Sequence, residues 1–175
     1  MKTKLNQKNT IILGISCYYH DSAAALMIDG EIIAAAQEER FSRIKGDSSF
    51  PHQAINYCLN EAKISLEEIT HIAFYENYLQ KFERILISAH LFAPFGLKNF
   101  LSSMPKWLTT NLWLENKITT ELGIKKNIIF FDHHLSHAAS AFYPSPFRKA
   151  AILTIDGVGE WSTTTYGIGF KNDIE

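Results

Sequence analysis

An Asp-Gly pair at positions 29 and 30 interrupts an apolar stretch and limits what the first forty residues can fold into. The surrounding residues 22–40 read SAAALMIDGEIIAAAQEER. Asp-Gly between two apolar runs is the strongest short-range signal for a β-hairpin. Residues 11–16, IILGIS, are a continuous apolar run typical of a buried strand. We therefore expect a three-stranded β-meander. The alanine triplets would suit a helix, but the Asp-Gly break argues against one long helix.

A loop, a helix and a fourth strand are expected after the meander. Arg40–Asp47 are predicted to form a polar loop, and Pro51 is typical of the first position of a helix that runs to about Ala62. SLEE at 65–68 matches a capping box for a short helical turn. HIAFYE at 71–76 is typical of a strand.

Residues 79–120 show no two-residue alternation, so we expect helices there. Pro94, Gly96 and Pro105 are predicted to break this segment into short helices. We interpret it as a helical layer inserted against the core, with a hydrophobic wall for a substrate or partner as the alternative. Its aromatic residues include Phe92, Phe95, Phe100, Trp107 and Trp113.

The last part of the chain alternates between strand and helix patterns. KNIIFF (126–131) is a predicted strand, and HHLSHAASAF (133–142) is an alanine-rich predicted helix. KAAILTID (149–156) is a second buried strand, and STTTYGIGF (162–170) could return beside it as a hairpin. The chain is therefore expected to be an α/β protein, with no internal repeat and no second complete domain.

Charge and cysteine content exclude some classes of function. Lys plus Arg total 17 and Asp plus Glu total 18, so the net charge of −1 gives no reason to expect nucleic acid or an anionic membrane as partner. Cys17 and Cys58 are far apart, which favours free buried thiols in a reducing compartment and leaves a disulfide as the alternative. The basic start and the apolar run ending in Cys17 are too short for a secretion signal. No stretch reaches the roughly 18 apolar residues of a membrane span. We expect a cytoplasmic protein.

Two histidines and one aspartate form a candidate metal site. His133 and His137 are four residues apart and share one face of the predicted helix, the spacing used when two imidazoles bind one metal. His134 lies about 100° around the axis and is expected to be a neighbour. Asp156 ends an apolar strand, where ligands gather in open α/β sheets. Two histidines and a carboxylate suit iron(II), manganese or zinc.

Other interpretations of these residues stay open. There is no H-E-x-x-H glutamate, so a zinc-protease mechanism has no general base. His133 could instead cap the helix, His134 could lie at the surface, and Asp156 could simply start a turn.

A second candidate site follows the first and third strands. His20 and Asp21 lie in the turn after the first strand, which faces the phosphates in nucleotide-binding folds that open with such a meander. Arg40, Arg43 and Lys45 follow the third strand and supply positive charge for an anion. The alternative is an ordinary solvated basic loop.

Three motifs together resemble one family. Residues 14–51 (GISCYYHDSAAALMIDGEIIAAAQEERFSRIKGDSSFP), residues 132–147 (DHHLSHAASAFYPSPF) and residues 150–161 (AAILTIDGVGEW) are similar to the carbamoyltransferases of nodulation and antibiotic biosynthesis. The resemblance extends from Ile12 to Phe170, although 77–125 carries little of it.

The resemblance implies a fold, a reaction and a set of ligands. It implies the first lobe of an actin/Hsp70/sugar-kinase-like nucleotide-binding fold, in the branch of the tRNA threonylcarbamoyl-transfer protein. It implies an enzyme that uses ATP and carbamoyl phosphate to form a carbamoyl-adenylate and passes the carbamoyl group to a small-molecule hydroxyl. It implies iron(II) or another divalent metal on His133, His137 and Asp156. His20 and Lys45, with Asp21 beside them, fall where carbamoyl phosphate or the adenylate is expected.

Members of that family are much longer than 175 residues. We therefore expect residues 1–175 to be the N-terminal portion of the metal- and nucleotide-binding domain, without the second lobe and the C-terminal domain. Such a chain is expected to be incomplete for catalysis alone, and to need a C-terminal partner chain or to self-associate. A catalytically silent metal- or nucleotide-binding module and an unrelated metal-dependent hydrolase are the alternative functions.

Overall fold

A computed structural model describes residues 9–175 and confirms the α/β class. The chain divides into two compact units, one built from residues up to Phe74 with Ile118–Ile129, the other from Tyr75–Lys117 with Phe130–Glu175. Most of the basic segment considered above as a signal, residues 1–8, lies outside the described residues. Among residues 9–175, no helix has both the length and the apolar character needed to cross a bilayer.

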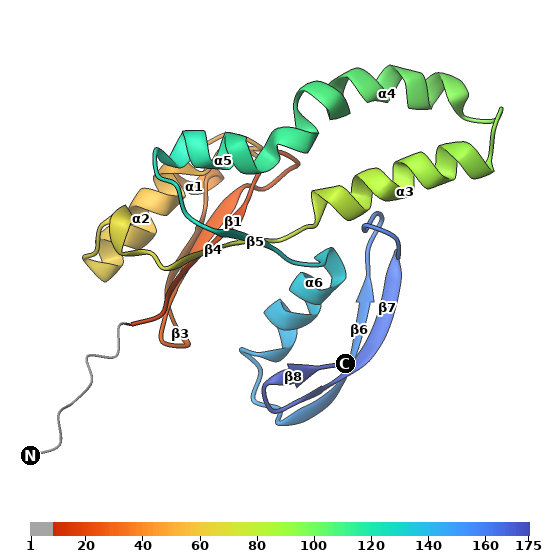
Figure 1. Cartoon of the computed structure of the whole chain (residues 1–175). Helices are drawn as coiled ribbons and strands as arrows, with labels where there is room; N and C mark the ends of the chain where they lie inside the picture. The colour runs from red at the N-terminus through yellow and green to blue at the C-terminus, as the bar shows by residue number, and fades with distance from the viewer. Residues whose placement is uncertain (1–8) are drawn as a thin grey trace, which may run out of the picture. The chain divides into compact units, whose positions relative to one another are not determined.

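The first unit contains a five-stranded mixed sheet in the order β3-β2-β1-β4-β5 (Figure 1). β1 pairs antiparallel with β2, and β2 pairs antiparallel with β3, so the predicted meander is confirmed. β4 pairs with β1 in parallel. The strands are β1 (Ile11–Ser16), β2 (Ala23–Ile28), β3 (Glu31–Gln37), β4 (His71–Phe74) and β5 (Ile128–Phe130).

The Asp-Gly turn joins β2 and β3 as expected. Asp29 and Gly30 both have positive φ, 51° and 90°, the conformation that two-residue hairpin loops require and that Asp and Gly tolerate best. The Asp29 carboxylate also accepts a hydrogen bond from the backbone N–H of Thr10 at 2.8 Å. Both residues of the turn thus favour the antiparallel register of the meander.

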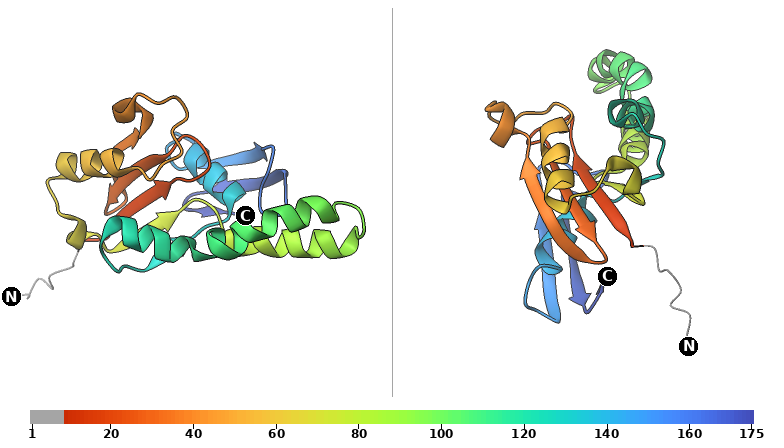
Figure 2. Two further views of the ribbon diagram at one scale, coloured as in Figure 1. Left: turned by 90° about the horizontal axis from the view of Figure 1, so that it is seen from above. Right: turned by 90° about the vertical axis from the view of Figure 1, so that its left-hand side faces the viewer.

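Helix α2 (His52–Ala62) packs against β2 and β3 and forms the core of this unit with them (Figure 2). Leu13, Leu26 and Cys58 are completely buried. Glu38 is also buried, and its carboxylate accepts hydrogen bonds from the N–H groups at the start of α2, including that of Ala54 at 2.8 Å. Cys17 and Cys58 are both buried and are not joined in a disulfide, as predicted.

Two short helical elements refine the predicted loops. Helix α1 (Glu39–Ser42) occupies the start of the segment predicted to be a polar loop, so that prediction is wrong for its first residues. The carbonyl of Glu38 begins α1 by accepting from Phe41 and Ser42. The predicted capping turn is present as η1 (Leu66–Glu68), where the Glu68 carboxylate accepts from the N–H of Ser65 at 2.7 Å.

The second unit begins with helices. The chain forms α3 (Tyr78–Leu91), α4 (Leu97–Thr109), η2 (Asn111–Trp113) and the start of α5 (Leu114–Leu122). The predicted break at Pro94 and Gly96 is confirmed, but the break expected at Pro105 is wrong because α4 continues through it. Trp107, two residues later, is buried and packs on Phe82 with ring centroids 5.4 Å apart, so tertiary packing outweighs one missing N–H donor.

A small sheet and one helix complete the second unit. β6 (Lys149–Ile155), β7 (Thr164–Phe170) and β8 (Asp173–Ile174) form an antiparallel sheet, and α6 (His133–Phe142) packs against β6 and β7 (Figure 1). The predicted helix and hairpin are both confirmed. Phe142 is buried over Gly169, where an added Cβ would lie 2.6 Å from its ring.

Replacement of Leu13 by Ala should destabilise the sheet strongly. The side chain is completely buried, so truncation removes buried apolar contacts and leaves a cavity, with an expected loss of about 2–5 kcal/mol in the free energy of unfolding. Ile32→Ala is the control, because Ile32 on β3 is 63% exposed and should cost less than about 1 kcal/mol. Urea denaturation followed by circular dichroism measures both. Equal losses would contradict the placement of the core.

Candidate metal centre

Helix α6 places His133 and His137 on one face. Its N-cap is Asp132, whose carboxylate accepts from the N–H of Leu135 at 3.0 Å, so His133 is the first helical residue and not the cap. The i, i+4 spacing brings the two imidazole rings together with centroids 4.6 Å apart. The expectation that these two side chains share a face is met.

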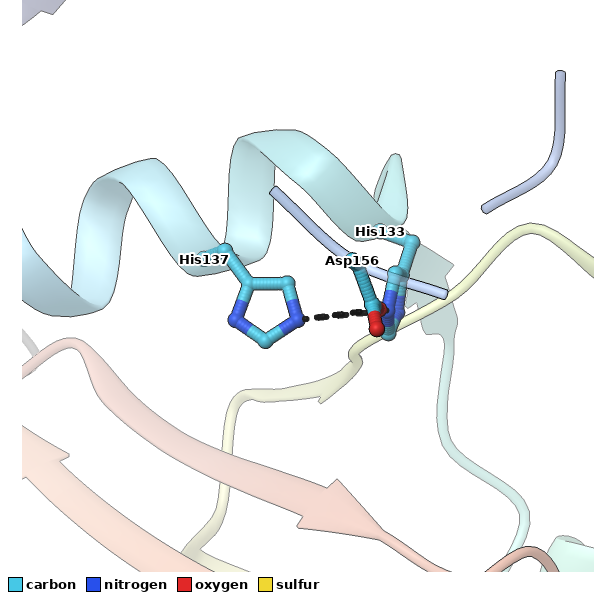
Figure 3. A group of neighbouring side chains, drawn as sticks. All are labelled: His133, His137 and Asp156. Carbon is cyan, nitrogen blue, oxygen red and sulfur yellow. Dashed lines mark hydrogen bonds and ion pairs between the residues drawn. The ribbon is translucent and has the colours of Figure 1, made fainter. Parts of the chain in front are cut away.

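Asp156 meets both rings from the end of β6 (Figure 3). Its backbone N–H donates to the carbonyl of Thr163 at 2.8 Å, which closes the turn that follows β6. Asp156 Oδ2 lies 2.6 Å from His133 Nε2 and 3.5 Å from His137 Nε2. The two Nε2 atoms are 3.2 Å apart. Asp156 is also the first residue of that turn, and its Oδ1 accepts from the N–H of Gly157 at 2.6 Å.

The donor set fits a divalent cation. Two imidazole nitrogens and a carboxylate oxygen lie within 4.8 Å of one another, and all three are atoms that bind divalent metals. A metal with bonds of about 2.1 Å places neighbouring ligand atoms about 3.0–3.4 Å apart. The two longer separations are already close to this range. The shortest separation is that of a hydrogen bond from His133 to the carboxylate.

The site is open on one side. The side chain of His133 is 15% exposed, whereas those of His137 and Asp156 are 52% and 35% exposed. The hydrogen bond from His133 lowers the pKa of Asp156, so the carboxylate stays ionised and available as a ligand. His133 Nδ1 is buried and has no hydrogen-bond partner among residues 9–175, unlike the usual ligating histidine, whose second nitrogen is paired.

His134 is not a ligand and does not lie at the surface. It is buried, with Nδ1 2.6 Å from Thr154 Oγ1 and Nε2 2.7 Å from the carbonyl oxygen of Ser162. A carbonyl accepts only, so Nε2 carries the proton and Thr154 donates to Nδ1. Thr165 Oγ1 lies 2.5 Å from that hydroxyl. His134 therefore ties α6 to both strands of the hairpin and to the turn that contains Asp156.

Glu160 and Arg84 were not identified from the sequence. The buried carboxylate of Glu160 accepts from the backbone N–H of Asn77 at 2.8 Å and from that of His133 at 3.1 Å. Arg84 Nη1 donates to the carbonyl of Gly159 at 2.6 Å. These contacts join residues 27 to 83 positions apart, and no local motif indicates them. The one sequence feature that could have indicated Glu160 is its position as a charged residue in a glycine-containing turn.

The second candidate site lies in the first unit. His20 Nδ1 is 2.7 Å from Asp21 Oδ2, and both side chains are exposed. Lys45 is exposed and has no hydrogen bond or ion pair with any of residues 9–175. The loop that contains Lys45 is joined to the turn that contains His20, because the carbonyl of Asp47 accepts from the N–H of Ser22 at 2.7 Å.

The two arginines of this candidate site differ from Lys45. Arg40 contacts Gln37 at 3.3 Å and Glu39 at 3.4 Å. Arg43 is exposed at the end of α1, with a φ of 60°. Arg40 is therefore already partnered on the protein surface, and Lys45 is the better candidate to meet an anion.

Gly159→Ala should disrupt the turn, whereas Gly157→Ala should not. A Cβ at Gly159 would overlap the carbonyl oxygen of Ser162 and lie 2.8 Å from the His134 ring, so the backbone must shift. We expect a loss of about 1–3 kcal/mol in the free energy of unfolding. A Cβ at Gly157 meets nothing within 4 Å, so this variant is the matched control. Urea denaturation of both variants tests the packing. An undisturbed Gly159→Ala protein would show that His134 does not hold the turn.

Comparison with known proteins identifies relatives over almost the whole chain. An uncharacterised protein of Synechocystis sp., sll1178, is 55% identical over 173 residues, which cover 94% of this chain and 28% of that protein. The nodulation protein NolNO of Sinorhizobium fredii is 36% identical over 162 residues, 90% of this chain and 22% of that protein. The chain thus spans less than a third of the length of these curated relatives.

Solved structures give weaker matches. YeaZ from Pseudomonas aeruginosa aligns with 95% of this chain and 63% of its own, at 12% identity and a TM-score of 0.46.

The family described as Carbamoyltransferase N-terminus matches residues 11–175, which include all the residues of both candidate sites. The chain belongs to the carbamoyltransferase N-terminus family.

Proposed function

We propose that this chain provides the metal-binding part, and a portion of the nucleotide-binding part, of an ATP-dependent O-carbamoyltransferase. The observation that carries the proposal is the convergence of His133, His137 and Asp156 in a member of the carbamoyltransferase family. Carbamoyl phosphate and ATP would give a carbamoyl-adenylate, and the carbamoyl group would pass to a hydroxyl of a small molecule. The second lobe and the adenylate-forming domain would be supplied outside residues 1–175, by a partner chain or by further sequence.

The metal would be held by His133, His137 and Asp156, and iron(II) is the ion that we propose. Two imidazoles and one carboxylate leave coordination positions open, and this set is typical of iron(II) sites. When bound, a divalent cation supplies a Lewis acid that polarises a carbonyl oxygen and neutralises phosphate charge. The exposed side of His137 leaves room for a substrate to approach.

His20 is the proposed base for the acceptor hydroxyl. Asp21 accepts from His20 Nδ1–H at 2.7 Å, so Nε2 is the nitrogen left to take a proton. In the transfer, the acceptor oxygen forms a bond to the carbamoyl carbon and the bond from that carbon to the adenylate oxygen breaks. AMP leaves, and the hydroxyl proton goes to His20.

Lys45 is the proposed contact for the anionic end of carbamoyl phosphate or the adenylate. Lys45 is exposed in a loop whose backbone is hydrogen-bonded to the His20 turn, and this contact supports the proposal that both residues meet the same ligand. An ammonium group meets a phosphate as a point charge and needs no fixed geometry. The proposal therefore requires only that the loop stays where its backbone contacts place it.

The metal assignment predicts a specific loss in the His137→Ala variant. The change removes one of three ligand atoms, so the affinity for Fe²⁺ should fall by at least about tenfold. Anaerobic titration with Fe²⁺, followed by desalting and metal analysis, measures this. His90→Ala is the control, since His90 is exposed on α3 and should bind no metal. Equal metal content in His137→Ala and the unaltered chain would rule the assignment out.

The anion assignment predicts weaker binding of carbamoyl phosphate in Lys45→Ala. A charged hydrogen bond contributes about 1.5–3 kcal/mol, so the dissociation constant should rise about tenfold or more. Isothermal titration calorimetry with carbamoyl phosphate measures the change. Lys125→Ala is the control, because Lys125 is an exposed lysine of the same unit. If Lys45→Ala binds as well as this control, the loop is an ordinary solvated surface.

A catalytically silent binding module is the competing function. It would bind metal and nucleotide as proposed, but it would not carry out carbamoyl transfer in any assembly. The two functions are distinguished by assaying carbamoyl transfer with the chain alone and with the remaining portion of the Synechocystis relative supplied as a second polypeptide. Activity only in the mixture, and only with residues 1–175 present, supports the carbamoyltransferase.

A further inference from the structure

We infer that Glu160 is a positioning residue that holds His133 against Asp156 and thereby sets the geometry of the metal centre. The inference rests on the proposed metal site. Glu160 itself is not one of the candidate ligands. Its side chain is 2% exposed, and both of its oxygens face backbone N–H groups.

Glu160 contacts the N-terminus of α6. The first N–H groups of a helix have no partner within the helix. Asp132 satisfies the N–H of Leu135, and Glu160 satisfies that of His133, which lies 3.1 Å from each of its two carboxylate oxygens. The turn from Asp156 to Thr163 therefore contacts both the ring and the backbone of His133. Its ring contacts Asp156 at the start of the turn, and its backbone contacts Glu160 four residues later.

The same carboxylate also reaches the start of α3. Glu160 Oε1 accepts from the N–H of Asn77 at 2.8 Å, and the Asn77 side chain caps α3 by accepting from Leu79 and Gln80. One buried group thus joins the beginnings of two helices to the turn after β6. A buried carboxylate without such donors would be costly, whereas the positive ends of two helix dipoles stabilise it.

The negative charge of Glu160 also favours a metal at this site. The N-terminus of a helix carries a partial positive charge, which disfavours a cation beside it. His133 is the first residue of α6, so a metal on its ring would lie near that end. The negative charge of Glu160 offsets the helix dipole there. A neutral residue at position 160 would lose this compensation as well as the hydrogen bonds.

Glu160→Gln is the decisive variant. It keeps the size of the side chain, but its amide NH₂ cannot accept a hydrogen bond, so the N–H of His133 loses one of two acceptors. The probe is Co²⁺ alone, titrated into the 175-residue chain and followed by its visible absorption bands, which report ligand number and geometry. We expect affinity about tenfold lower, as for other residues that orient a metal ligand, with altered bands. Glu160→Ala should lose more.

Amide exchange and a control variant distinguish a positioning role for Glu160 from a general loss of stability. Amide hydrogen exchange, measured by nuclear magnetic resonance without metal, should be faster at His133 in Glu160→Gln and at both His133 and Asn77 in Glu160→Ala, with the rest of the second unit unchanged. Glu83→Gln removes an exposed carboxylate from α3 in the same unit and should change neither the exchange nor the Co²⁺ titration.

The possible outcomes distinguish the inference from the proposed function. If the unaltered chain binds Co²⁺ and Glu160→Gln binds it with the same affinity and spectrum, the inference is overturned and the metal site stands. If the unaltered chain binds no Co²⁺, the proposed function fails and the inference fails with it. Global unfolding of Glu160→Gln would make Glu160 a residue of overall stability and would also overturn the inference.

Discussion

The turn from Asp156 to Thr163 folds back on the first residues of α6, and the candidate metal centre depends on this contact. The turn is closed at its base by the hydrogen bond from Asp156 N–H to the Thr163 carbonyl. Within it, Glu160 holds the backbone of His133, and the carbonyl of Ser162 holds the ring of His134. These hydrogen bonds hold the backbone at the start of α6 against the turn that carries Asp156.

Electrostatic balance relates the carboxylates around the start of α6 to the candidate metal centre. Three electron-rich ligand atoms this close together repel each other unless a proton or a metal lies between them. The N-terminus of α6 adds a partial positive charge of its own. Three carboxylates contact the first turn of α6: Asp132 at the N-cap, Glu160 at the backbone N–H of His133, and Asp156 at the ring of His133. The arrangement accepts a cation more readily than a bare helix N-terminus would.

Local sequence patterns predicted most helices and strands of the fold, but they could not predict contacts between residues far apart in the sequence. The Asp29-Gly30 hairpin, the boundaries of α6 and the β6–β7 hairpin all follow from turn chemistry and periodicity. The i, i+4 spacing placed His133 and His137 on one face, and the end of an apolar strand identified Asp156. Glu160 was missed because its partners come from distant segments. The break expected at Pro105 was wrong because burial of a neighbouring tryptophan outweighs local propensity.

Three histidines within five residues serve two different purposes, and helical periodicity separates them. His133 and His137 lie one turn apart and face Asp156, whereas His134, about 100° away, points into the hairpin. The Nε2 atoms of the first pair lie 3.2 Å apart beside the Asp156 carboxylate, while both nitrogens of His134 are already satisfied by a hydroxyl and a carbonyl. A metal can therefore compete for the first pair with only a proton to displace, but to bind His134 it would have to break the hydrogen bond to Thr154 or the one to Ser162. The same residue type is thus a candidate ligand on one face of α6 and a structural anchor on the other.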